Sequence, residues 1–285
     1  MLKLVSSVAR PHIVAIGALG TLTFSRVLTG ERDGVLAACA GVDWFVVNLL
    51  NRAVDVREDQ ANQVTGADVV ARHRKAVIVA GVVVLLLSLV VGAWLNPLTV
   101  PVRLAFHALG FAYNWPLFPG RRRIKELPFW KNTASATGFL LLCFILPLVT
   151  YPRADDITVA AVVVLAVYFF LFELSYEVLY DLRDVVGDRA AGIPTWPVLL
   201  GLRGGAAVAV GLMVMSFVVI VGGYVAGVVP WRAAIMGAAP ILQLALVARA
   251  LPTAVTSSLC VGLTWFGALL LGGYHAWELL GLPAD

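Results

Sequence analysis

The stretch Ala76-Val-Ile-Val-Ala-Gly-Val-Val-Val-Leu-Leu-Leu-Ser-Leu-Val-Val-Gly-Ala-Trp-Leu95 contains no charged side chain. About twenty predominantly apolar residues are what an α-helix needs to cross the hydrocarbon core of a bilayer. Arg74 and Lys75 stand directly before it, and basic residues are typical of the cytoplasmic flank of a membrane helix. The stretch therefore predicts a transmembrane helix.

Comparable apolar runs occupy most of the remaining chain, and no soluble domain or low-complexity segment interrupts them. The length criterion gives about nine candidate spans, and we expect an all-α polytopic bundle that forms a single domain over residues 1–285. The candidates are Pro11–Leu28, Gly34–Leu50, Ala76–Leu95, Val100–Trp115, Thr133–Val149, Ile157–Tyr176, Gly205–Val228, Trp231–Val247 and Ala254–Leu279.

The composition excludes a water-soluble globular protein. Charged residues make up 13% of the chain, apolar residues 60%, and the mean hydropathy is +0.90. A soluble domain typically has roughly 25% charged and 45–50% apolar residues. The cysteines Cys39, Cys143 and Cys260 are scattered in apolar runs, so neither a disulfide framework nor a metal cluster is expected.

The distribution of positive charge predicts the orientation. If the N-terminus is cytoplasmic, most of the 21 Lys and Arg residues fall on the cytoplasmic side, as the positive-inside rule requires. The other side keeps Arg26, Arg32, Arg103, Arg153 and Arg232. Because the basic residues gather at the ends of spans, nucleic-acid binding is not expected. The Val-, Ala- and Arg-rich composition favours the cell membrane of a bacterium with a high GC content.

A first group of oxygen-bearing side chains follows the second span. Asn51, Asp55 and Asp59 are four residues apart, so on a helix they share one face, and Asn48 extends this face into the membrane. The connections after the second, fourth and sixth spans are separated by even numbers of crossings. All three are therefore expected on the cytoplasmic side.

A second group follows the sixth span. Asp181, Asp184 and Asp188 have spacings of three and four and again share one helix face. Glu177 and Glu173 continue this face into the span. Two acidic helix ends are thus predicted to face a common space at one membrane surface.

Carboxylates packed together repel one another unless a cation compensates them. Mg²⁺ typically binds through one or two carboxylates, several waters and substrate phosphates, so two acidic groups suit a Mg²⁺–diphosphate complex held from both sides. The connection Arg121-Arg-Arg-Ile-Lys125-Glu-Leu-Pro-Phe-Trp-Lys131-Asn132 is expected on the same side. Its basic side chains are the usual partners of phosphate oxygens.

Simpler interpretations exist for each feature. A basic run beside a membrane is most often a topology anchor or a contact for anionic lipid. Single acidic residues such as Asp33, Asp43, Asp68 and Asp156 are most often solvated helix caps, and Glu173 and Glu177 could be buried contacts between helices. The combination of two acidic groups with a basic connection on one side favours a binding site over these interpretations.

At these residues the chain resembles the UbiA-type intramembrane prenyltransferases. Asn51-x-x-x-Asp55-x-x-x-Asp59 resembles the first Asp-rich motif of that family. The segment Asp181-Leu-Arg-Asp184-Val-Val-Gly-Asp188-Arg-Ala-Ala-Gly-Ile-Pro-Thr-Trp-Pro-Val-Leu-Leu-Gly201 resembles the second. Tyr113-Asn-Trp-Pro and the Arg122–Asn132 segment are similar to the Tyr-containing, Lys-rich middle loop, and Arg10-Pro11 to the start of the first helix.

The resemblance implies a bundle around a central cavity and Mg²⁺-dependent transfer of a polyprenyl group from its diphosphate to an acceptor, commonly aromatic, within the membrane. It implies catalytic roles for Asp55, Asp59, Asp184, Asp188 and Lys125. The Mg²⁺ ligands would be Asn51, Asp55, Asp59, Asp181, Asp184 and Asp188. The diphosphate would contact Asn51, Arg57, Arg121, Arg122, Lys125, Lys131 and Arg189. The acceptor or the carbocation would contact Tyr113, Glu173, Tyr176 or Glu177.

One segment departs from the family pattern. Many members continue the first motif with Asn-x-Pro-x-Arg-Pro, whereas Asn62-Gln-Val-Thr-Gly66 follows here. The acceptor is therefore left open. Two other functions also stay open, namely a transporter of a cation or anionic metabolite and a prenyl-diphosphate cyclase of the same fold. A transporter would place its charged groups near the bilayer midplane, whereas these lie at span ends.

Overall fold

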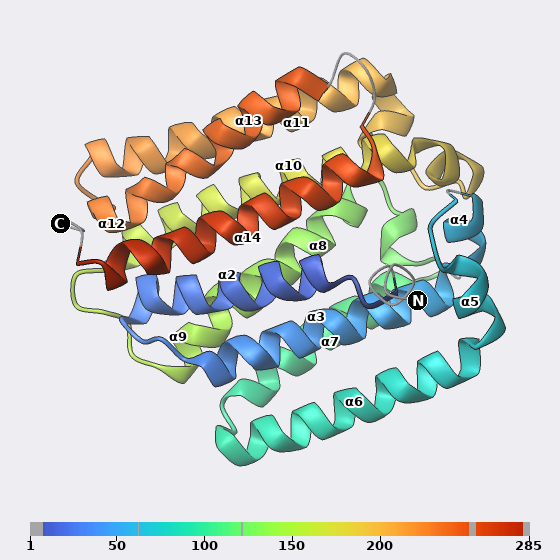
Figure 1. Ribbon diagram of the computed structural model, residues 1–285, viewed down its shortest axis with the longest axis horizontal. Helices are drawn as coiled ribbons and strands as arrows, with labels where there is room; N and C mark the ends of the chain where they lie inside the picture. The colour runs from blue at the N-terminus through green and yellow to red at the C-terminus, as the bar shows by residue number, and fades with distance from the viewer. Residues whose placement is uncertain (1–7, 62, 121, 251–254, 282–285) are drawn as a thin grey trace.

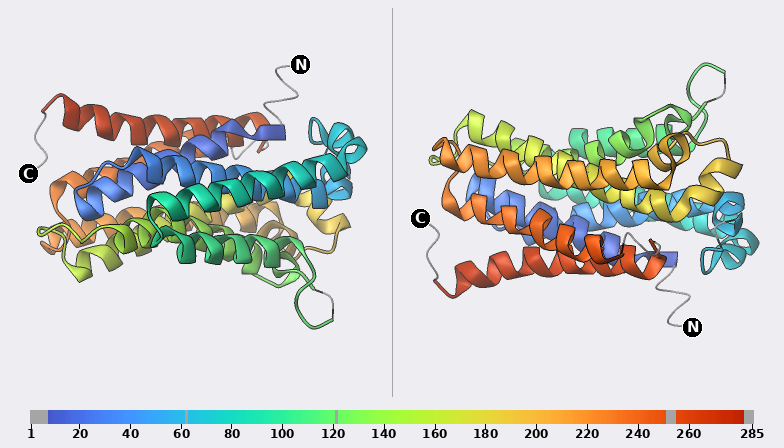
Figure 2. Two further views of the ribbon diagram at one scale, coloured as in Figure 1. Left: turned by 90° about the horizontal axis from the view of Figure 1, so that it is seen from below. Right: turned by 90° about the horizontal axis from the view of Figure 1, so that it is seen from above.

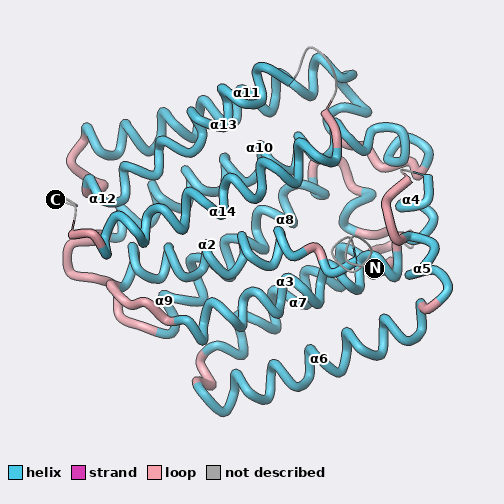
Figure 3. Tube along the Cα trace, in the orientation of Figure 1, coloured by secondary structure: helices cyan, strands magenta, loops and turns pink. Residues whose placement is uncertain are grey.

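The computed structural model describes residues 8–281 except residues 62, 121 and 251–254. These residues form long helices that run side by side (Figures 1 and 3), and no strand occurs among them. Eight of the helical segments are long and apolar enough to cross a bilayer. They are Pro11–Thr29 (α2), Gly34–Val54 (α3), Arg74–Leu95 (α6), Trp130–Thr150 (α8, Trp130–Leu140, and α9, Leu146–Thr150), Val159–Ala190 (α10), Trp196–Val225 (α11), Trp231–Ala248 (α12, Trp231–Ala234, and most of α13, Ala238–Ala250) and Ser257–Leu279 (α14).

The fourth predicted span is a shorter helix, α7, which covers Thr99–Asn114. Its 16 residues fall below the usual length of a spanning helix, but it packs against α3 and α6 within the bundle. The prediction of an all-α polytopic membrane bundle is confirmed. When α7 is counted with the eight longer segments, the described residues contain the nine spans that were predicted.

The polar connections gather at one end of the bundle, where α2 begins. The short helices α4 (Val56–Ala61), α5 (Ala67–Arg72) and η1 (Ile124–Glu126) lie there. Figure 1 shows α4 and α5 at this end, and Figure 2 shows the connection before α8 projecting from it. We call this the polar end of the bundle.

Helix α10 carries charged side chains beyond the apolar core because it is unusually long. Its 32 residues give a length of about 48 Å at 1.5 Å per residue, against a hydrocarbon thickness of about 30 Å. The helix starts at the far end, where the Thr158 side chain accepts a hydrogen bond from Ala161 N at 3.1 Å. Its last turns therefore reach the polar end, and the predicted end at Tyr176 falls well short of the observed one.

The helix that contains the opening stretch, α6, lies at the edge of the bundle (Figure 1). Its side chains Leu86, Val90 and Trp94 are 57%, 67% and 81% exposed. Large apolar side chains with this exposure require lipid around them. The bundle thus has the surface of an integral membrane protein.

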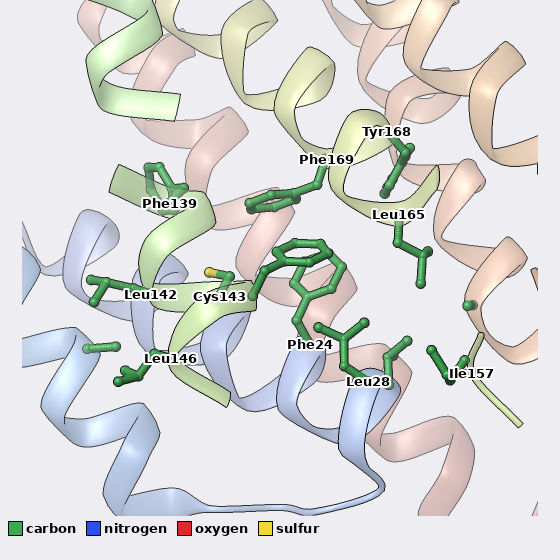
Figure 4. Packing of buried hydrophobic residues seen from close by; sticks show 14 of the residues in the cluster. Phe24, Leu28, Phe139, Leu142, Cys143, Leu146, Ile157, Leu165, Tyr168 and Phe169 are labelled. Carbon is green, nitrogen blue, oxygen red and sulfur yellow. The ribbon is translucent and has the colours of Figure 1, made fainter. Parts of the chain in front are cut away.

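Aromatic packing fixes α2 against α10 and the broken helix α8–α9. Phe24 lies 4.4 Å from Phe144 and 4.7 Å from Phe169 between ring centroids (Figure 4). A π-helical turn at Leu141–Ile145 separates α8 from α9, and Cys143 in this turn packs so closely on Gly20 that an added Cβ would lie 3.0 Å from its Sγ. Gly20, Phe24 and Phe169 of this core also line the apolar cavity described below.

A buried ion pair connects α3, α6 and α7. Arg103 Nε and Nη2 donate to the two oxygens of Asp43 at 2.7 Å each, and His107 Nε2 lies 2.9 Å from Asp43 Oδ1. Arg103 Nη1 also donates to the Ser88 carbonyl at 3.0 Å. The interpretation of Asp43 as a solvated cap is wrong, because Asp43 is 0% exposed inside α3 and is paired with Arg103 in α7. Both residues lie inside helices, because each neutralises the other. Asp33, by contrast, does cap α3.

Candidate active site

A cavity of about 200 Å³ opens at the polar end of the bundle. Residues from the start of α2, from α3 and α4, from α7, η1 and α8, and from α10 line it. Its charged and amide lining residues are Arg10, Asn48, Asn51, Asp55, Glu58, Asp59, Lys125, Lys131, Glu177, Asp181, Arg183, Asp184 and Asp188. We call it the polar cavity. Segments more than a hundred residues apart in the chain thus meet in one space.

The first acidic group lines one wall of the polar cavity. Helix α3 ends at Val54 and α4 begins at Val56, with Asp55 between them. The helical pattern of backbone hydrogen bonds nevertheless continues, because Asp55 N donates to the Asn51 carbonyl and Asp59 N to the Asp55 carbonyl, both at 2.8 Å. Asn51, Asp55 and Asp59 therefore stay on the cavity side although the helix is interrupted.

The second acidic group lies on the last turns of α10. Asp181, Asp184 and Asp188 all line the polar cavity, and Asp181 and Asp188 are almost fully buried. The predicted common face is therefore present, and the structure brings the two acidic groups to the same cavity.

The connection before α8 supplies cations to the first acidic group. Lys125 is 2% exposed, and its Nζ lies 2.6 Å from both Asp55 Oδ1 and Glu58 Oε2. Arg123 reaches the same two carboxylates at 3.3 and 3.0 Å. Its position is fixed by Glu126, whose Oε1 accepts from Arg123 Nε at 2.6 Å. Cations are thus held directly beside Asp55.

Lys131, in the first turn of α8, serves the second acidic group. Its Nζ lies 2.8 Å from Asp181 Oδ1 and 2.8 Å from Asp188 Oδ2. The next residue, Asn132, donates to the other oxygen of Asp181 at 2.8 Å. The two lysines therefore lie one beside each acidic group, as suits a diphosphate between them.

Burial affects the carboxylates at the end of α3. It raises the pKa of Asp55 above its ordinary value, although Lys125 and Arg123 act in the opposite direction. Burial likewise raises the pKa of Asp59, partly offset by Arg10 and Arg52. Both shifts mean that the charged form is poorly solvated, so a further bound cation would stabilise it.

A second, apolar cavity of about 290 Å³ lies deeper in the bundle. It shares four lining residues with the polar cavity, Ile13, Phe139, Glu177 and Tyr180. It extends between α2, α10, α13 and α14 as far as Trp277. A molecule with a charged head and an apolar tail could therefore occupy both cavities at once.

Most polar side chains at the start of the apolar cavity are hydrogen-bonded within the protein. Tyr176 donates to the Leu263 carbonyl at 3.0 Å, and the Tyr180 hydroxyl pairs with Thr264 at 2.9 Å. Glu177 accepts from Ser135 Oγ at 2.7 Å. Glu173, one turn deeper, is 8% exposed and lines the apolar cavity. The two glutamates are thus the acidic groups at the boundary of the two cavities.

Several predicted residues lie elsewhere. Arg57, Arg122 and Arg189 are exposed and do not line the polar cavity, whereas Arg121 falls outside the described residues. Tyr113 does line it, with Lys125 Nζ 6.0 Å from its ring centroid. Of the predicted diphosphate contacts in the described chain, the structure therefore brings Asn51, Lys125 and Lys131 to the cavity.

Four charged residues of this region were not predicted as site residues: Glu58, Arg123, Arg10 and Arg183. Glu58 is off the stripe of the first group, but its Oε2 lies 2.6 Å from Lys125 Nζ. The sequence does contain a hint for Arg123: Glu126 follows three residues later, a spacing at which opposite charges pair within one helical turn. Arg183 adjoins Asp184 and donates to it at 2.7 Å.

The donor set fits a hard divalent cation that is completed by substrate. Among the described residues no three His, Cys, Asp or Glu side chains already converge as a metal cluster. Mg²⁺, however, needs few protein ligands when phosphates and waters supply the rest. Asn51 Oδ1 is buried on this wall without a hydrogen-bond partner, so an acceptor atom beside Asp55 and Asp59 is available. The residues therefore fit Mg²⁺ in the presence of a diphosphate.

Comparison with known proteins shows the family of the chain. A sequence model described as the UbiA prenyltransferase family matches residues 34–258. The chain belongs to the UbiA prenyltransferase family. It is therefore an enzyme, a prenyltransferase, and the transporter alternative is set aside. The matched residues include both acidic groups and the basic connection between them.

The curated relatives of this UbiA-family chain include two archaeal enzymes. A digeranylgeranylglyceryl phosphate synthase of Pyrococcus abyssi is 27% identical over 69% of this chain and 68% of its own length. The protein of the same name from Thermococcus kodakarensis is 26% identical over 69% of this chain and 68% of its own length.

Solved structures share the fold. A UbiA homologue from Archaeoglobus fulgidus bound to DMAPP and Mg²⁺ superposes with a TM-score of 0.72 at 14% identity, over 94% of this chain and 96% of the other. The same homologue bound to GPP and Mg²⁺ gives 0.70 at 13% identity, over 95% and 97%. An apo UbiA homologue from Aeropyrum pernix gives 0.65 at 15% identity, over 95% and 98%. These likenesses support the bundle arrangement itself.

Proposed function

We propose that this prenyltransferase transfers a polyprenyl group, with Mg²⁺, from its diphosphate to the free hydroxyl of a glyceryl phosphate that already carries one prenyl chain. The observation that carries the proposal is the junction of the two cavities. A polar cavity lined by both acidic groups shares Ile13, Phe139, Glu177 and Tyr180 with an apolar cavity. The diphosphate head and the isoprenoid tail of one substrate would thus be bound on either side of this junction.

The choice of acceptor rests on the relatives. Their name describes a glyceryl phosphate with two geranylgeranyl groups, so a second prenyl group is added to a singly prenylated molecule. The aromatic acceptor expected from the wider family finds no support in these relatives. A carboxylate on an aromatic acceptor would also meet Glu177 and Glu173 at the junction, whereas a neutral hydroxyl would donate to them.

The metal would be held by the two acidic groups. Its ligands among Asn51, Asp55, Asp59, Asp181, Asp184 and Asp188 would be shared with the diphosphate. When bound, Mg²⁺ neutralises the charge that grows on the diphosphate as the allylic carbon–oxygen bond breaks.

Lys125 and Lys131 would hold the leaving group from the protein side. Each already lies within 2.8 Å of a carboxylate, so each is positioned before substrate binds. Preorganised charge of this kind stabilises a leaving anion without the cost of reorganising solvent. Asp55 and Asp188 therefore orient the lysines as well as contributing oxygen atoms.

The carbon side of the reaction would take place at the junction. The bond between the prenyl carbon and the diphosphate oxygen breaks, a bond forms to the acceptor hydroxyl oxygen, and the hydroxyl proton leaves. Glu177 is positioned to take that proton, because it lines both cavities and Ser135 holds one of its oxygens. The rings of Tyr113 and Tyr176 would face the developing cation, and Glu173 would contact the acceptor.

Replacing Glu177 with Gln is expected to lower kcat about 10²-fold, which is at the lower end of what a positioned general base contributes. The KM for the prenyl diphosphate should change less than about twofold, since the diphosphate is held by other residues. Steady-state kinetics of the purified enzyme would measure both. Glu31→Gln, at the opposite end of the bundle, is the matched control; a Glu177→Gln enzyme with unchanged kcat would remove this residue from the mechanism.

The orientation and the extent of the domain complete the proposal. The polar end would face the cytoplasm because most Lys and Arg residues fall on that side, and residues 1–285 would act as one domain. The relatives are archaeal, so the bacterial source favoured by the composition has no support from them.

The test is transfer of a radiolabelled prenyl group by purified protein in detergent. Diphosphates of several chain lengths would be combined with the singly prenylated glyceryl phosphate and with aromatic acceptors, with and without Mg²⁺. A labelled diprenyl product that disappears on chelation supports the proposal. Labelling of aromatic acceptors alone would contradict it. A cyclic prenyl product formed without any acceptor would identify the chain as a cyclase.

A further inference from the structure

The cations that line the polar cavity differ in their partners. Lys125, Lys131 and Arg183 each contact at least one carboxylate. Arg10 instead donates from Nη1 to the neutral Asn48 Oδ1 at 3.2 Å. Among the described lining residues it is the only Lys or Arg with no carboxylate in ion-pair contact. Arg10 acts on Asp59 only from a distance, so the guanidinium is free of direct carboxylate contact and can bind an anionic ligand.

The backbone holds Arg10 in an unusual conformation. Arg10 has φ 46° and ψ 58°, and Pro11 follows it directly. A non-glycine residue with positive φ is uncommon, and the residue before proline normally adopts an extended conformation. Such a conformation costs on the order of 1–3 kcal/mol and persists where the surroundings require it. Here it accompanies a guanidinium that faces the polar cavity.

Asn48, on the neighbouring helix α3, positions this guanidinium. Its Nδ2 donates to the Trp44 carbonyl at 2.9 Å, which leaves Oδ1 as the acceptor for Arg10. Asn48 lies one turn before Asn51 on α3, so Arg10 is held beside the first acidic group. Neither Lys125 nor Lys131 shares a partner with Arg10. The polar cavity therefore has one cation that is separate from the two lysines assigned to the diphosphate.

The helix that follows Arg10 leads into the apolar cavity. Ile13, one turn later, lines both cavities, and Ile16 and Gly20 line the apolar one. A lipid whose anionic head lies at Arg10 could thus extend its chain along α2. Its hydroxyl group would then be near Glu177 at the junction.

We propose that Arg10 is the anchor for a phosphate group on the acceptor lipid, distinct from the site of the prenyl diphosphate. This inference rests on the proposed function and specifies its acceptor as a phosphomonoester. A guanidinium forms two parallel hydrogen bonds to phosphate, which an ammonium cannot reproduce. Arg10 would thus select acceptors by their head group and place their hydroxyl at the junction.

The experiment compares two acceptors, the singly prenylated glyceryl phosphate and the same lipid without its phosphate. Arg10→Gln should raise KM for the phosphorylated acceptor about 10–100-fold, the range expected for loss of a charge-assisted hydrogen bond. It should change KM for the prenyl diphosphate and the turnover of the dephosphorylated acceptor much less than it changes KM for the phosphorylated acceptor. Arg10→Lys should restore part of the loss because it keeps the charge.

Arg72→Gln, exposed on α5 at the same end of the bundle, is the matched control for surface charge. Equal effects of Arg10→Gln on the two acceptors, or a raised KM for the diphosphate alone, would overturn the proposal. If the Arg10 variants fail to fold, inhibition of the wild-type enzyme by glycerol phosphate tests the proposal. Inhibition that is competitive with the acceptor supports the anchor, whereas inhibition that is competitive with the diphosphate overturns it.

Failure of the proposed function gives a different result. A wild-type enzyme that uses neither glyceryl acceptor would overturn the proposed acceptor and the anchor together. The anchor alone is overturned if the wild-type enzyme uses both glyceryl acceptors and Arg10→Gln affects the two acceptors equally.

Discussion

Replacing Asp184 or Asp55 with Asn is expected to lower prenyl transfer by about 10³-fold or more, the scale expected when charge stabilisation of a leaving group is removed. Each residue lines the polar cavity, one from each acidic group. Asn has almost the same shape as Asp but cannot neutralise a cation. The loss should therefore appear in kcat/KM for the diphosphate, while the helices still insert and pack.

Two measurements separate a catalytic defect from misfolding. Transfer of labelled prenyl groups reports the activity, and thermal unfolding in detergent reports whether the variants keep their stability. Asp68→Asn is the matched control, because Asp68 lies on α5 and does not line the polar cavity. Full activity in either the Asp184 or the Asp55 variant would disprove the proposed role of that acidic group.

The second large effect concerns stability. Asp43→Ala leaves Arg103, which is 0% exposed, without its carboxylate partner inside the bundle. Breaking a buried ion pair from one side typically costs about 3–5 kcal/mol. In a chain of this size we expect the melting temperature to fall by roughly 10 °C, with activity per folded molecule preserved.

A double substitution distinguishes the charge from the packing. Asp43→Leu combined with Arg103→Met removes both charges and should recover most of the melting temperature, since an uncompensated buried charge is no longer present. Together with the single variants Asp43→Leu and Arg103→Met it completes a double-mutant cycle. A double variant as unstable as Asp43→Ala would mean that hydrogen bonds to His107 and Ser88, more than the ion pair, hold α3, α6 and α7 together.

Much of the site was predictable because helical periodicity is local. Spacings of three and four residues place Asp181, Asp184 and Asp188 on one face wherever α10 lies. The number of crossings then brings the connections after α3, α7 and α10 to the same end. Neither step requires knowledge of which helices are neighbours.

The positions of the basic side chains were less predictable. Arg57 and Arg189 adjoin the acidic groups in sequence but are exposed, because adjacent positions on a helix point in different directions. Arg123 and Glu58 are 65 residues apart in the chain and meet only in the folded bundle. A charge count along the sequence cannot reveal such contacts.

By itself the sequence determined that this chain crosses the membrane as a helical bundle and that two acidic groups lie at one end. Apolar length and helical periodicity depend on residues close together in the chain, which is why they can be deduced from it. Only the tertiary structure decided that Arg10 faces the cavity without a carboxylate, that Glu177 lies between two cavities, and that Asp43 neutralises Arg103. These contacts join residues far apart in the chain, and their energies arise from burial and charge that exist once the helices have packed.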